Sequence, residues 1–280
     1  MSWSAPAPGG PTEPQGRGGE RQDPPASAFP LPDPPAAGRP AQPVPEPARY
    51  TPLGGRARAT RTALFVVAAL DVVGLVSGLV QLYVLQGIES GELSDGAATA
   101  NDVFYGGIGI VQLLALITTA VLFLRWFYAA YGNLPLLSAG SPRFKRGWAI
   151  GAWFVPILNL FRPKQIANDI WRGSDPQLSP EASPDWSGGS LPGLYALWWG
   201  GWIVDNFLDN LAFRLTLRAE EFPELYASTY AYLAADAIEI PLAFVAAAVV
   251  SRTTRRQEER AAALSSGAAP EPSGQSDSGR

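Results

Sequence analysis

The chain lacks cysteine and histidine entirely, and lysine occurs only at positions 145 and 164 of its 280 residues. Without these side chains it has no disulfide, no thiolate nucleophile, no Cys/His metal site, no histidine-ligated haem and no histidine-based triad. The phosphate-binding patterns GxxxxGKS, GxxxxGKT and GxGxxG are also absent. We therefore expect a protein that is not an enzyme and that carries no cofactor and no metal.

Charged residues are scarce as well. They make up 16% of the chain, against about 25% in a typical soluble domain, whereas hydrophobic residues make up 47%. The mean hydropathy of +0.04 averages two unlike parts, because the N-terminal region has almost no aliphatic run and the middle of the chain holds several long ones. This composition indicates that water is not the only solvent of the chain.

Four apolar runs are long enough to cross a bilayer core, which is about 30 Å thick and takes about 20 helical residues. They predict transmembrane helices over residues 62–86, 103–124, 191–213 and 226–250. Residues 148–161 form a shorter run that contains Pro156 and has basic residues on both sides, so we interpret it as an interfacial or re-entrant segment. The predicted fold class is an all-α integral membrane protein with about four transmembrane helices, this short segment and disordered termini.

Lysine and arginine residues indicate the orientation of these helices. If both termini are cytoplasmic, every Lys and Arg except Arg214 and Arg218 lies on the cytoplasmic side, as the positive-inside rule requires. A fifth crossing by residues 148–161 would put the C-terminal arginines outside. We therefore expect a multi-pass protein of the cell membrane with both termini in the cytoplasm.

The two ends of the chain differ from its middle. Residues 1–58 are mostly Pro, Gly, Ala, Gln and Glu, which is typical of a disordered, polyproline-like tail. A membrane domain over residues 59–251 follows, and then a second disordered cytoplasmic tail over residues 252–280. The spacings Pro8 to Pro11 and Pro11 to Pro14 match ligands of aromatic grooves, although a segment so rich in proline also contains such spacings by chance.

The most distinctive stretch runs from Phe123 to Pro176, where aromatic and basic residues are interspersed and Pro156 and Pro163 lie on either side of Asn159. Its cytoplasmic position favours binding of anionic lipid headgroups or of a partner, and membrane anchoring alone is the alternative. The candidate residues of this motif are Arg125, Trp126, Trp148, Trp153, Pro156, Asn159, Arg162, Pro163, Trp171 and Arg172.

This stretch resembles the bacterial membrane-protein family of domain of unknown function 4328, found mainly in actinobacteria. The resemblance extends over about residues 60–250 and rests on Arg125–Trp126, Tyr131–Leu134, Trp148–Pro156, Asn159, Arg162–Pro163 and Ile170–Ser174. It implies the membrane fold and location, and no activity, since the family has no assigned biochemistry. At position 169 this chain has Asp where the family pattern has the longer Glu, which shortens the reach of that side chain.

Polar residues inside the predicted spans form a second candidate site: Asp71, Asp205, Asn206, Asp209, Asp236 and Glu239. An ionisable group at bilayer depth costs on the order of 2.5–3.5 kcal/mol on insertion, and no Lys or Arg is expected at this depth as a partner. One interpretation is a carboxylate-lined cavity that handles protons or cations. The alternatives are hydrogen-bonded helix contacts, or a third helix so near the interface that Asp209 and Asn210 meet water.

Small and aromatic residues predict how the helices pack. Gly74 and Gly78, four residues apart in the first span, favour the close approach of another helix. The segment Trp198–Trp202 holds three indoles around two glycines, and we expect it to pack against a neighbouring helix; a ligand site is the alternative.

Two functions agree with these features. The leading hypothesis is a non-enzymatic scaffold or sensor in the lipid bilayer, whose proline-rich tail recruits a cytoplasmic protein partner. The alternative is a small transporter, or a proton- or cation-conducting protein, that uses the buried carboxylates. A membrane enzyme ranks third, because its chemistry would have to run without His or Cys. No nucleic-acid partner is expected.

Overall fold

The computed structural model describes residues 49–138, 140–179, 184–186, 188 and 191–267. The chain divides into two units, Met1–Pro47 and Ala48–Arg280, and the described residues belong to the second. Predictions for residues 1–48 and 268–280, including the PxxP spacings and most of the proline-rich tail, lie outside the described residues.

The described part of the chain is all-helical and contains no β-strand, which confirms the predicted fold class. The elements in chain order are α1 (Gly54–Glu89), α2 (Asp95–Gly132), α3 (Leu134–Leu137), α4 (Trp148–Gly151), the short 3-10 helix η1 (Leu158–Leu160), α5 (Arg162–Gly173), α6 (Gly193–Thr216) and α7 (Phe222–Ser265).

Three helical stretches are long and apolar enough to cross a membrane. They are α1, α7, and residues 96–137, which comprise nearly all of α2 together with α3. Many apolar side chains of α2 lie on the outside of the bundle, among them Leu113, Leu114 and Ile117, as expected for a helix that faces lipid. The predicted third span is observed as α6, which is not one of the three because Asp205, Asp209 and their polar neighbours lower its hydropathy. Its crossing stays a prediction.

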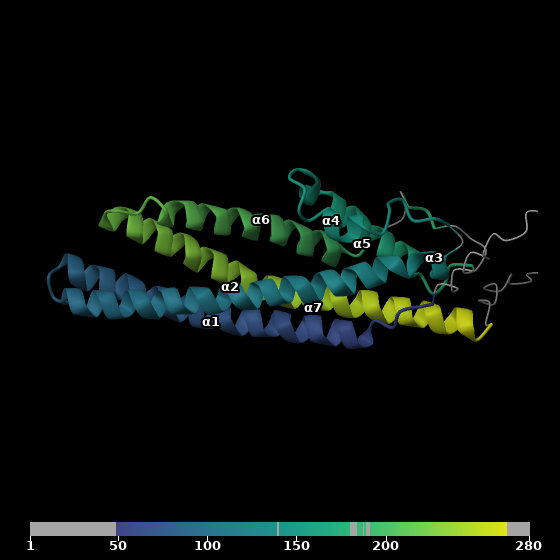
Figure 1. The fold of residues 1–280 in the computed structure, drawn as a ribbon, viewed down its shortest axis with the longest axis horizontal. Coiled ribbons are helices and arrows are strands. Elements are labelled where there is room, and N and C mark those ends of the chain that lie inside the picture. Colours follow the sequence, from purple (N-terminus) through teal and green to yellow (C-terminus); the bar gives the residue numbers. More distant parts are fainter. Residues whose placement is uncertain (1–48, 139, 180–183, 187, 189–190, 268–280) are drawn as a thin grey trace, which may run out of the picture. The chain divides into compact units, whose positions relative to one another are not determined.

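The long helices pack as two hairpins. The helix α1 packs along both α2 and α7, and α6 packs along α7. Figure 1 shows the α1–α2 and α6–α7 connections at one end of the bundle, while α3, α4 and α5 lie toward the other end. In this arrangement, the middle parts of the four long helices lie at a similar height along the bundle. The motif segment lies at one end of it.

Glycine permits the close contacts of α1 that its sequence predicts. A Cβ atom on Gly74 would lie 2.6 Å from Asp236 Oδ2 and equally far from Gln112 Nε2, and one on Gly78 would lie 2.7 Å from Leu233 Cδ2. Neither position has room for a larger side chain. The predicted close approach is confirmed, and α7 is the helix that approaches.

Helical structure extends beyond the predicted membrane domain at both ends, so the disorder predicted for the adjoining residues is wrong. The helix α1 begins at Gly54 rather than after residue 58, and α7 continues to Ser265, so residues 252–265 are helical rather than disordered. The polar end of α7 is held by tertiary contacts, since Gln257 is 0% exposed and Arg260 is 1% exposed. Its polar composition alone does not reveal these contacts.

Residues 148–161 do not form a continuous helix. The short helices α4 and η1 are separated by turns, and Ile157, directly after Pro156, has a φ of 69°, which is rare for a β-branched residue. The segment is therefore folded too irregularly to cross a bilayer as one helix, in agreement with the sequence-based interpretation. Its position at the interface stays a prediction.

Candidate functional site

The predicted intramembrane acids meet near the middle of the bundle. Asp71 lies midway along α1 and Asp236 lies in the first half of α7, and one amide group of α2 joins them. Gln112 Nε2 donates to Asp71 Oδ1 at 3.3 Å and to Asp236 Oδ1 at 3.2 Å. The sequence analysis missed Gln112, although its single polar side chain within a long apolar run was a usable signal.

Two of these acids are deeply buried and incompletely bonded. Asp71 is 1% exposed and Asp205 is 7% exposed. Asp71 Oδ2 and Asp205 Oδ1 are buried and accept no hydrogen bond from any described residue. An ionised carboxylate that is buried without a partner is costly, so each group needs a proton or a cation to balance its charge.

The cluster extends to Asp209 and Glu239. Asp209 and Glu239 line the same cavity as Asp205, and the five carboxyl groups lie near enough to repel one another when ionised. Within the described part of the chain, no Lys or Arg forms an ion pair with any of these five carboxyl groups. The structure therefore brings together the five acids that the sequence nominated, on three helices.

Asn206 is less integrated in this cluster. Its side chain is exposed, and Nδ2 donates to the carbonyl oxygen of Trp202, one turn earlier in α6, at 2.8 Å. Its donor is thus used within its own helix, and it adds no bridge between helices.

A cavity of about 340 Å³ adjoins the acids. Asp205, Asp209 and Glu239 contribute carboxyl groups to its wall, and none of its lining residues is basic. Another part of the cavity lining is aromatic. This aromatic wall is formed by Phe123, Trp153, Phe154, Trp198 and Trp202. The remaining lining is mostly aliphatic and comes from α1, α2 and α7. The cavity is therefore apolar with one acidic region.

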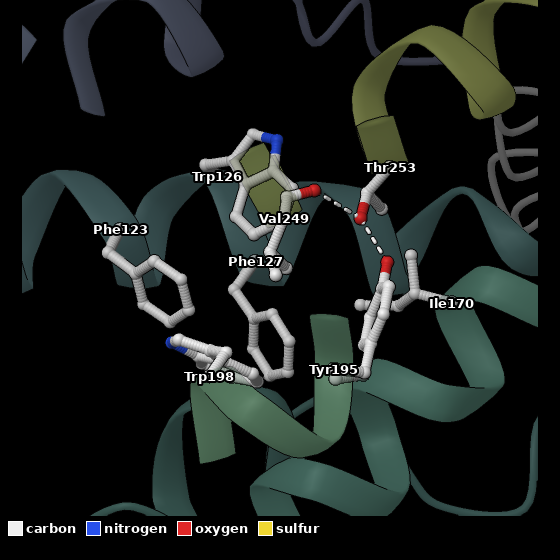
Figure 2. Close-up of a pocket in the computed structure, with 9 residues that line it drawn as sticks. Phe123, Trp126, Phe127, Ile170, Tyr195, Trp198, Val249 and Thr253 are labelled. Carbon is white, nitrogen blue, oxygen red and sulfur yellow. Dashed lines mark hydrogen bonds between the residues drawn. The ribbon is translucent and has the colours of Figure 1, made fainter. Parts of the chain in front are cut away.

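Behind the aromatic wall, the bundle is closely packed (Figure 2). Phe123 and Trp198 belong to the cavity and also to this packed region, where their ring centroids are 6.0 Å apart and no space remains for a water molecule. Thr253 Oγ1 donates to the Val249 carbonyl at 2.7 Å, and a second hydrogen bond joins it to the Tyr195 hydroxyl. The aromatic wall thus adjoins a closely packed, hydrogen-bonded region of the bundle.

A second buried network joins the ends of several elements near the motif segment. Asn133 Nδ2 donates to the Thr51 carbonyl at 2.9 Å and to Gln257 Oε1 at 3.0 Å, while the Thr51 N–H donates to Asn133 Oδ1. Gln257 Nε2 donates to the Ala130 carbonyl at 3.1 Å and to Ser174 Oγ at 2.9 Å. These bonds tie the start of α1 and the ends of α2 and α5 to α7.

The Asp at position 169 has a partner despite its short side chain. Arg143 donates to both of its carboxylate oxygens, with the shortest contact at 2.5 Å from Nη2 to Oδ1. Burial raises the pKa of Asp169, and the Arg143 guanidinium opposes this rise. The shorter residue therefore still reaches the basic loop.

Many of the predicted motif residues serve packing. Trp126 Nε1 donates to Thr254 Oγ1 at 2.9 Å, Arg172 Nη1 donates to the Trp186 carbonyl at 2.7 Å, and Trp171 lies 4.4 Å from the Arg256 guanidinium. Arg162 lies over the rings of Phe144 and Trp148, and Trp153 belongs to the aromatic wall. Pro163 is buried in the first turn of α5, Asn159 is half-buried, and Arg125 and Pro156 are exposed.

These arrangements limit the chemistry that the chain offers. Among the described residues, no group of three or more Asp and Glu side chains is arranged to hold a metal ion. The five acids of the cluster share one region of the bundle, but their carboxyl groups do not converge on a common metal position. Their arrangement suits a proton, or a cation that does not need several carboxylate ligands at once.

The comparison with protein families agrees with the resemblance that the motif indicates. The family model described as Domain of unknown function (DUF4328) matches residues 89–255. The chain belongs to this family. The DUF4328 region includes α2 to α6, most of α7 and four of the clustered acids, whereas α1 with Asp71 lies almost entirely before it. No curated protein and no solved structure matches the chain.

Proposed function

We propose that this protein handles cations within the membrane, and that its clustered carboxyl groups take up a proton or a cation. The proposal rests on how the charges of the acid cluster are left unbalanced. Five acids from three helices meet in the bundle, and none forms an ion pair with a described basic residue. Two of their buried oxygens also lack a hydrogen-bond donor. Intramembrane acids of this kind are typical of proton and ion pathways.

The proposed setting is the cell membrane, with both termini in the cytoplasm. The distribution of Lys and Arg supports this orientation. The common position of the α1–α2 and α6–α7 connections at one end of the bundle supports it as well. In this orientation, the motif segment faces the cytoplasm and the acidic α1–α2 connection faces outward.

A scaffold or sensor is the second proposal. The hydrogen bonds of Asn133 and Gln257 support it, because they hold several element ends in one arrangement, as a platform for a partner requires. Its proline-rich tail and cytoplasmic protein partner stay predictions, since residues 1–48 lie outside the described residues. Neither proposal involves an enzymatic activity.

Flux through reconstituted vesicles tests the first proposal. The purified protein in vesicles is expected to dissipate an imposed proton or monovalent-cation gradient, followed with a pH-sensitive or cation-sensitive dye. Asp205→Asn keeps the shape of the side chain but removes its charge, so the flux should fall to that of empty vesicles. Glu92→Gln, an exposed acid outside the cluster, is the matched control and should retain the flux. If vesicles with the wild-type protein keep the gradient as long as empty vesicles do, the cation-handling proposal is wrong and the scaffold is the remaining proposal.

A further inference from the structure

The cavity beside the acids has features that neither a proton nor a bare metal ion requires. We propose that it binds a lipophilic organic cation, such as an amine or a quaternary onium ion with an apolar body, between the aromatic wall and the carboxyl groups of Asp205, Asp209 and Glu239. This inference rests on the proposed cation-handling function and names its ligand class.

The size and the lining of the cavity suit such a ligand. Its volume of about 340 Å³ falls within the range of roughly 300–1,000 Å³ that is usual for sites of small organic molecules. Most lining side chains are aliphatic or aromatic. A proton needs no cavity, and a bare metal ion needs several oxygen ligands around one point, which this lining does not provide.

The aromatic wall is preorganised, because its rings already pack against one another. Trp202 stacks on Trp199 with ring centroids 4.8 Å apart, and it meets Trp153 edge-on at 5.4 Å. Phe123 also meets Trp153 edge-on, at 5.6 Å. Faces of aromatic rings attract organic cations by about 0.5–2 kcal/mol each, most strongly where water is excluded. These rings hold one another in place, so binding a ligand does not have to order them.

The acidic region supplies the opposite charge. Asp205 is the central group, because it lines the cavity, is 7% exposed, and has a buried Oδ1 without a hydrogen-bond donor. Asp209 lies one turn later in α6, and Glu239 faces it from α7. The lining contains no Lys or Arg, so the site favours cations over anions of the same shape.

Two helix faces border the cavity. The lining residues of α2 (Leu116, Thr119, Ala120, Phe123 and Leu124) and of α6 (Trp198, Trp202, Asp205, Asn206 and Asp209) follow helical spacing. The helices α2 and α6 are not among the pairs that pack extensively along each other. The two helices meet here through side chains such as those of Phe123 and Trp198, so the apolar body of a ligand would lie between side chains of both helices.

A pair of ions with equal shape and opposite charge tests the inference. Tetraphenylphosphonium is expected to bind the full-length protein in nanodiscs saturably, with one site per chain, beyond its partition into empty nanodiscs. Tetraphenylborate should show partition only. Asp205→Asn should weaken tetraphenylphosphonium binding at least tenfold, and Glu239→Gln should weaken it several-fold. Trp202→Leu should weaken it as well, while Trp202→Phe keeps an aromatic face and should restore most of it. Glu92→Gln should bind as the wild type does.

The outcomes separate this inference from the function on which it rests. Helical circular dichroism and a single gel-filtration peak establish that each variant is folded; if Asp205→Asn is not, Glu239→Gln and the Trp202 pair still decide. Saturable binding of tetraphenylborate, or no saturable binding of tetraphenylphosphonium, overturns the organic-cation site. If proton or inorganic-cation flux that depends on Asp205 persists in that case, the proposed function stands without this ligand class. Absence of both flux and binding overturns both.

Discussion

At the residue scale, Gln112 connects two helices through a single amide nitrogen that serves both Asp71 and Asp236. Such a bridge explains why acids are tolerated here, since each carboxyl group gains a donor in a region without water. It does not satisfy Asp71 Oδ2 or Asp205 Oδ1. Asp71 and Asp236 therefore hold helices together, whereas Asp205, which lines the cavity, keeps an oxygen free to accept from a ligand.

The bridge predicts a difference between two substitutions of Asp236. Asn keeps an oxygen that accepts from Gln112, so Asp236→Asn should change the free energy of unfolding by less than about 1 kcal/mol. Asp236→Leu leaves the Gln112 donor with one partner fewer and should cost more, about 1–2 kcal/mol. Unfolding of the purified protein with increasing SDS, followed by circular dichroism, measures both. Equal stability of the two variants would show that the hydrogen bond contributes little.

At the element scale, α7 links the acids to the buried network of the motif segment. Its early part carries Asp236 and Glu239, and its last turns carry Gln257 and Arg260. Arg260 Nε donates to the Leu137 carbonyl at 2.9 Å, and Arg256 pairs with Asp175 at 2.8 Å. These contacts continue α7 as a helix well beyond its apolar part.

Gln257 should be the main contributor to this anchoring. Gln257→Ala removes a side chain that is 0% exposed and takes one hydrogen bond each from Asn133, Ser174 and the Ala130 carbonyl, so we expect a loss of about 2–3 kcal/mol. Arg255→Ala is the control, because Arg255 is exposed and its 3.6 Å pair with Glu259 lies on the surface; its effect should stay below about 0.5 kcal/mol. The same SDS titration reports both values, and equal losses would contradict the anchoring role.

The elements also show what sequence patterns can and cannot predict. The long helices were predictable because apolar runs of membrane length have few alternatives. The close approach at Gly74 was predictable because only small residues permit it. The helix over residues 252–265 was not, since its residues are polar and its order depends on distant partners such as Asn133. The cavity was not either, because Phe123, Trp153 and Asp205 come from separate segments, and only packing shows that they share a space.

At the scale of the whole molecule, the described unit has two unlike ends. One holds the two hairpin connections, and the other holds the short helices and both polar networks around Gln257 and Asp169. This asymmetry agrees with the proposed orientation, in which basic residues gather on the cytoplasmic side.

Reporter fusions map this orientation. Fusions after residues 140, 180 and 260 should report the cytoplasm, and fusions near residues 95 and 220 should report the outside. The decisive pair is 180 and 220, because together they ask whether α6 crosses the membrane despite its polar residues. If both positions report the same side, α6 does not cross and the four-span arrangement is wrong.

Truncation of the N-terminal tail should depend on where the cut lies. Removal of residues 2–48 leaves all described contacts in place, so the protein should reach the membrane in normal amounts. Removal of residues 2–55 also deletes Leu53, which is fully buried, and the Thr51 contacts with Asn133. The loss of Leu53 burial alone costs about 1.5–3 kcal/mol. Membrane fractionation and the SDS titration should therefore distinguish the two truncations, and equal behaviour would contradict a role of residues 49–53 in the fold.

Pro241 lies inside α7, two residues after Glu239 and directly before Leu242 and Ala243 of the cavity wall. A proline has no N–H to donate to the carbonyl one turn earlier, so the helix bends there more easily than elsewhere. The half of α7 beyond Pro241 is fixed by Gln257, whereas the half before it continues through a short connection into α6. The earlier half is also held against α1 and α2 at Gly74 and Gln112. A charge that enters beside Glu239 should therefore change the bend of α7 at Pro241 only as far as these contacts give way, and spin labels on Tyr83 and Tyr230 would detect the change in bend as a change in their separation.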